Sequence, residues 1–315
     1  MFFSIVVCTY NRARYVQAYL PTALTQAFDP TCYEVIVVDN NSSDNTRPVV
    51  EQLQTQHPHL RYCFEPKQGL SHARNAGWRA ANGRYIAYLD DECRVAGDWL
   101  TRAATIVDQY APVVFGGDVG AFYESQRPRW WREAYSADFC HTYGAPARWL
   151  SDGKCVVGGN MFVQREALEH VNGFDPNFGM HGDTVHFGEE DDLVARLSNH
   201  HQMPFVYYDS ELSVSHLVRP EKLTILRRYR TQIARSYAWM MINQQQPAHF
   251  SRRTAALFYL YLCKTAVTET LNAIFLRDKT KYPHWQNYLY QSKLLIEGSH
   301  HLGLLKAQRS RSNWA

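Results

Sequence analysis

The N-terminal third of the chain alternates short apolar runs with segments that repeat apolar side chains every three to four positions. The apolar runs cover residues 4–9, 33–39, 60–64 and 84–89. The segments between them predict three helices. The first covers residues 14–28, the second follows residues 40–43 and ends at about Gln56, and the third covers residues 71–81. Continuous apolar strands separated by helices are typical of a parallel sheet that helices cover on both faces. The expected fold class is therefore α/β, with a Rossmann-like, mostly parallel sheet.

The pattern changes twice in the rest of the chain. Residues 111–219 are less regular and contain paired glycines, several tryptophans and a second acidic run. From Pro220 the spacing becomes helical, and proline suits the first turn of a helix that runs to about Asn243. A further helix is predicted over about residues 252–276.

These changes divide the chain into a main domain and a tail. We expect a main domain over residues 1–219, with halves at residues 1–110 and 111–219, and a helical C-terminal extension over residues 220–315. With 315 residues, of which 45% are apolar, the chain has ample material for one enlarged α/β core.

Charge and cysteine content narrow the surroundings in which the chain works. The formal net charge of +3 is too small to suggest nucleic-acid binding, although basic residues crowd the C-terminal third. Seven cysteines, an odd number with no C-x-x-C pair, argue against a disulfide framework or a zinc site and favour a reducing cytoplasm. Residues 4–9 lack the flanks of a signal peptide. No stretch of about 20 residues is free of charge, so no membrane span is expected.

Polar clusters follow three of the apolar runs: Thr9-Tyr10-Asn11, Asp39-Asn40 and Asp90-Asp91-Glu92. Ligands of parallel α/β sheets bind beyond the carboxyl ends of the strands, so these clusters are expected at a site. Three acidic side chains in a row repel one another unless a cation or donor groups offset their charge. Carboxylate oxygens suit Mg²⁺ or Mn²⁺ bridging a diphosphate, and a solvated acidic turn is the alternative.

A second acidic run, Glu189-Glu190-Asp191-Asp192, opens a segment with helical spacing. Acidic residues in a first turn stabilise a helix through its dipole. The run is therefore either a helix start or the seat of a general base that takes a proton from a hydroxyl group. Residues 68–77 place Arg74 in the first turns of another helix, where a helix start and an arginine together favour phosphate.

In their joint order, these motifs resemble glycosyltransferase family 2, which has the GT-A fold. The matching pieces are residues 7–11, 37–44, 69–77, 86–92, 157–163, 172–175 and 188–193. The resemblance implies an inverting, metal-dependent transfer of a sugar from a nucleotide-diphosphate sugar to an acceptor hydroxyl, in polysaccharide or glycoconjugate synthesis. It also implies that the first half of the main domain binds the nucleotide and the second half the acceptor.

The resemblance assigns roles residue by residue. Nucleotide contacts are implied for Thr9, Tyr10, Asn11, Arg12, Asp39, Asn41, Arg74, Asp90 and Asp91. A Mn²⁺ or Mg²⁺ ion is implied at Asp91, Glu92 and His216. Contacts with the acceptor or the diphosphate are implied for Trp130, Trp131, Gly159, Asn160, Glu189, Arg227 and Arg228. Glu92 is a departure, because the family usually has an aspartate there.

The catalytic base of the family is the aspartate of a Glu-Asp pair. Glu190 takes that position if Gly188-Glu189 and Asp192-Leu193 set the register. A shift of one residue makes the base Asp191. We favour Glu190 and keep Asp191 as the alternative.

Several assignments have an ordinary structural alternative. His216 follows a strand pattern, where a lone histidine often has a structural role. Arg227 and Arg228 also fit a solvated basic face. Trp130 and Trp131 fit either a wall on which a sugar stacks or a hydrophobic core.

The tail suggests a surface for a partner. Its predicted helix over residues 252–276 is largely apolar, with Lys264 and Glu269 on one side and basic residues at its ends. This pattern suits a membrane interface, or packing on the main domain or a partner subunit. The expected partners are a UDP-sugar, a carbohydrate or lipid-linked saccharide acceptor and a membrane surface, but no nucleic acid. The expected location is the cytoplasm, with peripheral attachment to the cytoplasmic face of the membrane.

Two other functions compete with sugar transfer. A nucleotide- or carbohydrate-binding module without catalysis would not need the acids at residues 90–92 and 189–192. A nucleotidyltransferase would usually carry a glycine-rich loop after its first strand, and residues 9–13 contain no glycine.

Overall fold

The computed structural model describes residues 1–315 except 152, 183, 185, 203, 243–251 and 313–315. Contacts within this described part group the chain into two units. The first unit comprises Met1–Phe122, Ser136–Thr184 and Glu189–Leu217, and the second comprises Tyr123–Tyr135, Val185–Gly188 and Val218–Ala315. The C-terminal tail therefore groups with two short segments from the middle of the chain, which the sequence-based boundary assigns to the main domain.

Four parallel strands form one half of the sheet in the first unit. β1 (Phe3–Thr9) lies between β2 (Tyr33–Asp39) and β4 (Tyr85–Asp90), and β3 (Leu60–Phe64) pairs with β2. Every residue of β2 is buried, as expected for a strand covered on both faces. The four predicted strands agree with these bounds to within one residue.

The other half of the sheet is mixed. Its strands are β5 (Cys93–Val95), β6 (Val114–Phe122), β7 (Arg148–Leu150), β8 (Asn160–Gln164) and β9 (Val206–Leu217). Within the described residues the order is β3-β2-β1-β4-β8-β6-β9-β5, with β7 also on β9. β6 and β9 are parallel, whereas β8 runs antiparallel to β4 and β6. The stretch that looked irregular in sequence therefore completes the sheet.

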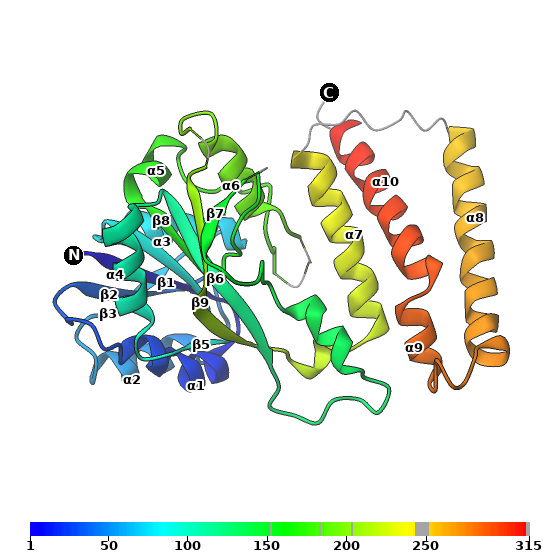
Figure 1. Cartoon of the computed structure of the whole chain (residues 1–315), viewed down its shortest axis with the longest axis horizontal. Helices are drawn as coiled ribbons and strands as arrows, with labels where there is room; N and C mark the ends of the chain where they lie inside the picture. Colours follow the sequence, from blue (N-terminus) through cyan, green and yellow to red (C-terminus); the bar gives the residue numbers. More distant parts are fainter. Residues whose placement is uncertain (152, 183, 185, 203, 243–251, 313–315) are drawn as a thin grey trace. The chain divides into compact units, whose positions relative to one another are not determined.

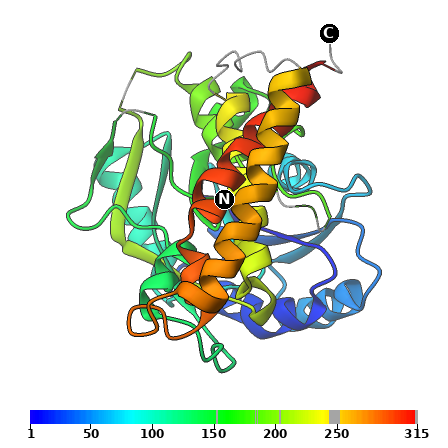
Figure 2. The ribbon, with the colours of Figure 1, turned by 90° about the vertical axis from the view of Figure 1, so that its right-hand side faces the viewer.

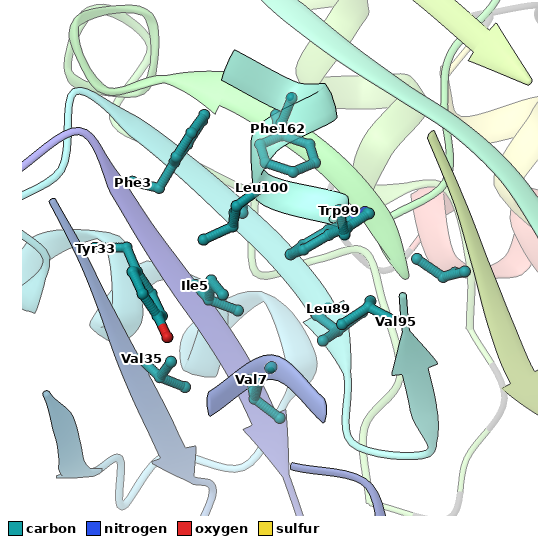
Figure 3. Close-up of a cluster of buried hydrophobic side chains, with 14 of the residues drawn as sticks. Phe3, Ile5, Val7, Tyr33, Val35, Leu89, Val95, Trp99, Leu100 and Phe162 are labelled. Atoms are coloured by element: carbon teal, nitrogen blue, oxygen red, sulfur yellow. The ribbon is translucent and has the colours of Figure 1, made fainter. Parts of the chain in front are cut away.

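One face of the sheet packs against α1 (Ala13–Leu24), α2 (Thr46–Gln54) and α4 (Trp99–Tyr110). Figure 3 shows Ile5 and Val7 of β1 in the same buried cluster as Trp99 and Leu100 of α4. Burying each such large apolar side chain stabilises the fold by about 1.5–3 kcal/mol.

The opposite face packs against α3 (Leu70–Ala80), α5 (Arg165–His170) and α6 (Glu189–Leu197). Val6, between Ile5 and Val7 in β1, joins this second core because side chains alternate along a strand. Helices on both faces confirm the predicted α/β architecture, and they leave the carboxyl ends of the strands as the place for a site.

The second unit is helical (Figures 1 and 2). It contains α7 (Ile225–Ile242), α8 (Arg252–Leu271), α9 (Trp285–Tyr290) and α10 (Ser299–Ser312), with π-helical turns at Asn272–Leu276 and Leu294–Gly298. Figure 1 shows α10 between α7 and α8. α10 approaches α7 closely at Gly303, where a Cβ would lie 2.5 Å from the carbonyl oxygen of Ile233. The predicted helix over residues 252–276 corresponds to α8 and the π-helical turn that follows it.

The start of α7 differs from the sequence prediction. Pro220 opens only a 3₁₀ turn, Pro220–Lys222, and α7 begins at Ile225. The Thr224 Oγ1 accepts a hydrogen bond from the backbone N–H of Arg227 at 3.1 Å, which satisfies a donor at the helix start. The predicted helix start at Pro220 is therefore wrong, because the Thr224 hydroxyl caps the first turn of α7 and the proline does not.

Candidate active site

The loops after β1 and β2 hold each other in place. The Asn11 Oδ1 accepts a hydrogen bond from the backbone N–H of Ser43 at 2.7 Å, and the Asn11 N–H donates to Ser42 Oγ at 2.9 Å. The Asp39 carboxylate accepts from the Ser42 N–H and from the Tyr62 hydroxyl, each at 2.8 Å. The edge where the sequence predicts nucleotide contacts is therefore pre-organised.

Two other predicted nucleotide contacts lie on the same loops. Tyr10 follows β1 and is partly buried, and Asn41 is exposed with a left-handed φ of 65°. Their neighbour Asn40, to which the sequence assigned no role, is 6% exposed. Its Oδ1 accepts from the Gly69 N–H at 2.8 Å, and its Nδ2 donates to the Lys67 carbonyl at 2.6 Å. Asn40 therefore ties the β2 loop to the start of α3.

Asp91 forms a buried ion pair at the end of β4. Its Oδ2 accepts a hydrogen bond from Thr9 Oγ1 at 2.7 Å, and its Oδ1 accepts from Arg12 Nη1 at 2.8 Å. Burial raises the pKa of Asp91, because desolvation outweighs the favourable charge of Arg12. In return, the Asp91 charge raises the pKa of Arg12. Asp91 is thus engaged with protein groups through both oxygens.

The residues on either side of Asp91 meet His216. The His216 Nε2 lies 3.3 Å from Glu92 Oε1 and 3.6 Å from Asp90 Oδ2. Cys93, the first residue of β5, pairs with His216 of β9 in the antiparallel ladder. Ligand atoms of Asp90, Cys93 and His216 lie within 4.8 Å of one another. We call Asp90, Glu92, Cys93 and His216 the His216 cluster.

This cluster differs from the predicted metal set of Asp91, Glu92 and His216. Asp90 replaces Asp91 beside His216, because Thr9 and Arg12 hold the Asp91 oxygens. Cys93 joins through strand register, which its position after three acids did not reveal. Carboxylate, imidazole and thiol groups together are a set of cation ligands.

Arg74 of α3 links the other acidic run to the sheet. Its Nη1 lies 3.1 Å from Glu189 Oε1 and 3.1 Å from Glu190 Oε1. Its guanidinium lies 5.3 Å from the ring centroid of Phe174 and 5.8 Å from that of Tyr88. Arg74 is 3% exposed, so the ion pairs are buried. It positions the two glutamates, a role that its expected contact with the nucleotide did not include.

Burial and charge act in opposite directions on this group. Burial would lower the pKa of Arg74, but the charges of Glu190 and Glu189 outweigh it and keep the guanidinium protonated. Burial, together with the charge of Glu190, raises the pKa of Glu189 despite the nearby Arg74. One buried cation therefore serves two adjacent carboxyl groups.

A pair of glycines brings the two acidic regions together. The Gly158 N–H donates to Glu190 Oε1 at 2.9 Å. A Cβ at Gly158 would lie 2.0 Å from Arg74 Nη2, and one at Gly159 would lie 2.9 Å from Asp90 Oδ2. A side chain at either position would force Arg74 or Asp90 to shift, so the two glycines let the backbone of residues 158–159 pass between Arg74 and Asp90. We call Arg74, Gly158, Glu189 and Glu190 the Arg74 cluster; sequence reasoning named Gly159 but overlooked Gly158.

Asp191 faces a different environment from Glu190. It is exposed, and among the described residues its carboxylate makes no hydrogen bond or ion pair. Its charge acts on Tyr143 and Cys155, whose pKa values are raised mainly by burial. Partial desolvation and the charge of Glu190 raise the pKa of Asp191 to about 6.

Asn160 is enclosed in the sheet. It is 0% exposed, its Oδ1 accepts from Trp99 Nε1 at 3.1 Å, and its Nδ2 donates to the Leu212 carbonyl at 2.6 Å. A side chain so enclosed fixes the end of β8 and does not reach an acceptor. The expected ligand contact at Asn160 is therefore replaced by a role in holding the glycine pair before it.

The remaining predicted residues belong to the second unit. Trp130 and Trp131 pack with Tyr135 and Tyr290. The rings of Tyr135 and Tyr290 stack on each other with their centroids 4.0 Å apart. The guanidinium of Arg228 lies 3.8 Å from the Tyr290 ring centroid. Arg227, next to it, is partly buried in the first turn of α7. These side chains form an aromatic and basic core of that unit.

Comparison with known proteins identifies the family. The model of glycosyl transferase family 2 matches residues 4–171, which is more than half of the chain. The chain belongs to glycosyl transferase family 2. The predicted family is confirmed, and the matched segment contains β1 to β4 and the glycine pair.

Two relatives of this chain come from Haloferax volcanii. The chain is 29% identical over 187 residues to glycosyltransferase AglE of Haloferax volcanii, covering 59% of this chain and 60% of AglE. It is 26% identical over 287 residues to glucosyl-dolichyl phosphate glucuronosyltransferase of the same organism, covering 88% of this chain and 85% of the relative.

Solved structures agree with the fold. Mannosyltransferase PcManGT from Pyrobaculum calidifontis, in complex with GDP-Man and Mn²⁺, has a TM-score of 0.62 at 18% identity, covering 98% of this chain and 87% of the other. Staphylococcus aureus TarS 1–349, in complex with UDP-GlcNAc, has a TM-score of 0.56 at 14% identity, covering 99% and 92%. The mixed α/β fold is that of GT-A glycosyltransferases, as predicted.

Proposed function

We propose that the chain is an inverting glycosyltransferase that moves a sugar from a nucleoside-diphosphate sugar to an acceptor hydroxyl, with a divalent cation. The observation that carries this proposal is that two acidic clusters lie next to each other beside the carboxyl end of the parallel strand β4. The His216 cluster has the ligands for a cation, and the Arg74 cluster presents a positioned carboxylate. Membership of the family, and the sugar nucleotides bound to PcManGT and TarS, support it.

The donor end of the site follows from the loops after β1 and β2. We propose that Thr9, Tyr10, Asn11, Arg12, Asp39 and Asn41 form the rim on which the nucleotide binds. A UDP-sugar is the favoured donor, as in the TarS complex. Thr9, Asn11, Arg12 and Asp39 are already held by hydrogen bonds to neighbouring protein groups, so the rim needs little reorganisation on binding.

The cation is proposed to bind Asp90, Glu92 and His216. Oxygen and nitrogen ligands fit Mn²⁺ more closely than Mg²⁺, which prefers oxygen alone. Mn²⁺ in the PcManGT complex supports a divalent ion at this fold. When bound, the ion supplies positive charge for the diphosphate leaving group. Asp91 supports the site indirectly, because it anchors the β4 end to Thr9 and Arg12.

Glu190 is proposed as the general base. Within the described residues, both hydrogen bonds of its side chain go to Oε1, from Arg74 and from the Gly158 N–H. The Oε2 is therefore the atom that takes the proton of the acceptor hydroxyl. One displacement by that hydroxyl inverts the sugar carbon and needs no covalent sugar-enzyme intermediate. Asp191 stays the alternative base, and its exposure away from Arg74 favours Glu190.

We keep residues 111–219 as the acceptor half, with Gly159 and Glu189 near the reacting groups. Trp130, Trp131, Arg227 and Arg228 remain proposed contacts of the acceptor or the diphosphate. The relative named for a dolichyl phosphate substrate supports a lipid-linked saccharide acceptor.

A lipid-linked acceptor requires the enzyme to reach a membrane surface, and we propose that α8 provides the protein face that contacts it. Leu262 of α8 and Ala273 of the π-helical turn after it are buried. The opposite side of α8 and this turn exposes large apolar side chains, among them Leu257, Leu260, Val267, Leu271 and Phe275, which are 49–72% exposed. Figure 2 shows α8 in front of α10.

The net charge of the C-terminal segment favours one kind of partner for this face of α8. Residues 252–315 carry ten Lys and Arg against three Asp and Glu, a net charge of +7, whereas residues 1–251 carry −4. An apolar helix face on a basic segment matches an anionic bilayer surface. Among the described helices, none is long and apolar enough to cross a bilayer. We propose that α8 lies on the membrane at the cytoplasmic face.

Liposome flotation tests this attachment. The full-length protein should float with anionic vesicles and much less with neutral ones, and L260E/F275E should abolish flotation. Thr268→Glu, which adds a charge at an exposed polar position of α8, should leave most of it. Equal flotation of L260E/F275E and the parent would refute the α8 surface.

A transfer screen tests the function as a whole. The full-length enzyme is incubated with Mn²⁺, a panel of nucleotide sugars and lipid-linked or free glycan acceptors, and release of nucleoside diphosphate is measured. We expect release from one class of donor, stimulated by an acceptor, and a product of inverted anomeric configuration by NMR. A retained configuration would refute the single displacement.

A further inference from the structure

We infer that Cys93 gives the His216 cluster a sulfur ligand, so that thiophilic divalent cations bind there and displace the cation that serves the donor. The displacement rests on the proposed function, whereas the sulfur ligation rests on the geometry alone. The chemical class of ligand is a soft or borderline divalent ion, such as Zn²⁺ or Cd²⁺.

Three different ligand atoms converge at this point. A carboxylate oxygen of Asp90, the Sγ of Cys93 and a ring nitrogen of His216 lie within 4.8 Å of one another. Ligands of one zinc ion at about 2.0–2.3 Å lie roughly 3–4 Å apart. Small side-chain rotations therefore suffice to gather all three around one ion. Glu92 Oε1 lies 3.3 Å from His216 Nε2 at the edge of this set.

Strand register fixes the sulfur in place. Cys93 is the direct partner of His216 between β5 and β9, and the Leu217 N–H donates to the Glu92 carbonyl at 3.0 Å. Directly opposed residues of an antiparallel pair have Cβ atoms about 4.5–5.5 Å apart, so their side chains share one face. Cys93 is 2% exposed, which keeps its thiol inside the cluster.

The glycine pair limits how the ligands can move. A Cβ at Gly159 would lie 2.9 Å from Asp90 Oδ2 and 3.8 Å from Cys93 Sγ. The backbone of Gly159 therefore closes one side of the cluster, directly over the oxygen and the sulfur. A confined set of oxygen, nitrogen and sulfur ligands favours an ion that accepts four ligands, as Zn²⁺ does.

Ligand softness then separates the cations. Thiolate selects Zn²⁺ and Cd²⁺, whereas Mn²⁺ and Mg²⁺ prefer oxygen. On coordination the Cys93 thiol gives its proton to solvent and a sulfur–metal bond replaces the S–H bond. The oxidation state of the metal does not change, so no further reactant is needed. A four-ligand ion leaves fewer open positions for a diphosphate, which predicts competition with the donor.

Metal titration of the full-length protein tests the sulfur ligation without any turnover. Cd²⁺ is titrated into the parent, C93S and C63S, and the ultraviolet thiolate-to-metal charge-transfer band is recorded. Cys63, half-buried on β3, controls for the loss of one thiol. We expect C93S to lose the tightest binding step, with Cd²⁺ affinity reduced about tenfold or more, and C63S to match the parent. Mn²⁺ affinity, from electron paramagnetic resonance, should change far less in C93S.

Two further measurements keep the outcomes distinct. H216Q, which retains the thiol, should also lose the tight Cd²⁺ step, so the inference survives if C93S folds poorly by circular dichroism. UDP affinity in Mn²⁺ should fall on addition of Zn²⁺ in the parent, and much less in C93S. An unchanged charge-transfer band in both C93S and H216Q would overturn the inference while leaving the glycosyltransferase proposal intact. Failure of the parent to bind either UDP or GDP in Mn²⁺ would instead refute the proposed function.

Discussion

The two acidic regions of the first unit use the same residue types but are held differently. At residues 90–92, Arg12 pairs with the middle acid, Asp91, and its own side chain is 27% exposed. At residues 189–190, Arg74 is shared by two adjacent glutamates, and its side chain is 4% exposed. Arg12 thus reaches solvent and binds Asp91 closely, with Glu92 Oε2 farther away at 3.7 Å, whereas Arg74 is enclosed and lies 3.1 Å from each of its two glutamates.

In the region around β4, the residue that anchors the chain differs from the residues proposed to bind the cation. In the region around α6, one residue does both. Around β4, Asp91 anchors the strand end, while Asp90 and Glu92 remain beside His216. Around α6, Glu190 is both bound by Arg74 and proposed to react. Changes at Arg74 should therefore disturb the fold and the chemistry together, whereas changes near Arg12 should separate them.

The largest effect is expected at the proposed base. Glu190→Gln keeps the shape and a hydrogen-bonding oxygen but removes basicity. Because general-base catalysis typically contributes about 10²–10⁴-fold, turnover should fall by that range while donor affinity is kept. Asp191→Asn is the matched control and should retain most turnover. A dead Asp191→Asn beside an active Glu190→Gln would move the base by one position.

The two arginines should differ in their effect on stability. Arg74→Met leaves Glu189 and Glu190 buried without their cation, and removing one partner of a buried ion pair costs about 3–5 kcal/mol. Arg12→Met should cost less, because the Arg12 side chain is partly exposed. Urea unfolding of both variants gives the comparison. Equal losses would contradict the distinction between the two clusters.

The acids around β4 should separate by cation affinity. Glu92→Gln should weaken Mn²⁺ binding by about tenfold or more, because a proposed ligand is lost. Asp91→Asn should weaken it less and lower the thermal midpoint instead, because Asp91 anchors Thr9 and Arg12. Mn²⁺ titration followed by electron paramagnetic resonance measures the first effect, and calorimetry the second. The opposite ranking would restore Asp91 as the ligand.

The smallest effect is a pH dependence at Asp191. Its pKa of about 6 exceeds the ordinary value near 4, so the folded state binds this proton more tightly than the unfolded state does. Stability from this group is therefore present at low pH and is lost as pH rises through about 6. Asp191→Asn should raise the thermal midpoint slightly at pH 8 and less at pH 5. A gain of equal size at both pH values would exclude this titration.

The sequence predicts the first half of the sheet well, because β1, β2 and β4 are buried on both faces. The runs that became β1 to β4 contain almost only apolar residues, and such runs leave little freedom in their bounds. β6 was not predicted because its paired glycines interrupt the apolar run. β9 was not predicted either. The start of α7 failed for a local reason, since Thr224 competes with Pro220 as the helix cap.

The sequence predicted those parts of the site that lie within one continuous motif. The acids at residues 90–92 and 189–192, Arg74 and His216 all lie in the first unit, where contacts join them into two clusters. What sequence could not give is the partner of each acid, because that depends on register and on backbone contacts. Cys93 meets His216 only through the β5–β9 ladder, and Gly158 matters only because Arg74 lies against it.

The central claim is that this edge of the sheet binds a nucleoside diphosphate through a divalent cation. Isothermal titration calorimetry of the full-length protein with UDP, and then with GDP, in Mn²⁺ and in EDTA, tests it most directly. We predict that at least one of these nucleotides binds in Mn²⁺, and that its affinity falls sharply in EDTA and in Glu92→Gln. Binding of equal affinity in Mn²⁺ and EDTA would contradict the cation site, and no binding of either nucleotide in Mn²⁺ would contradict the account as a whole.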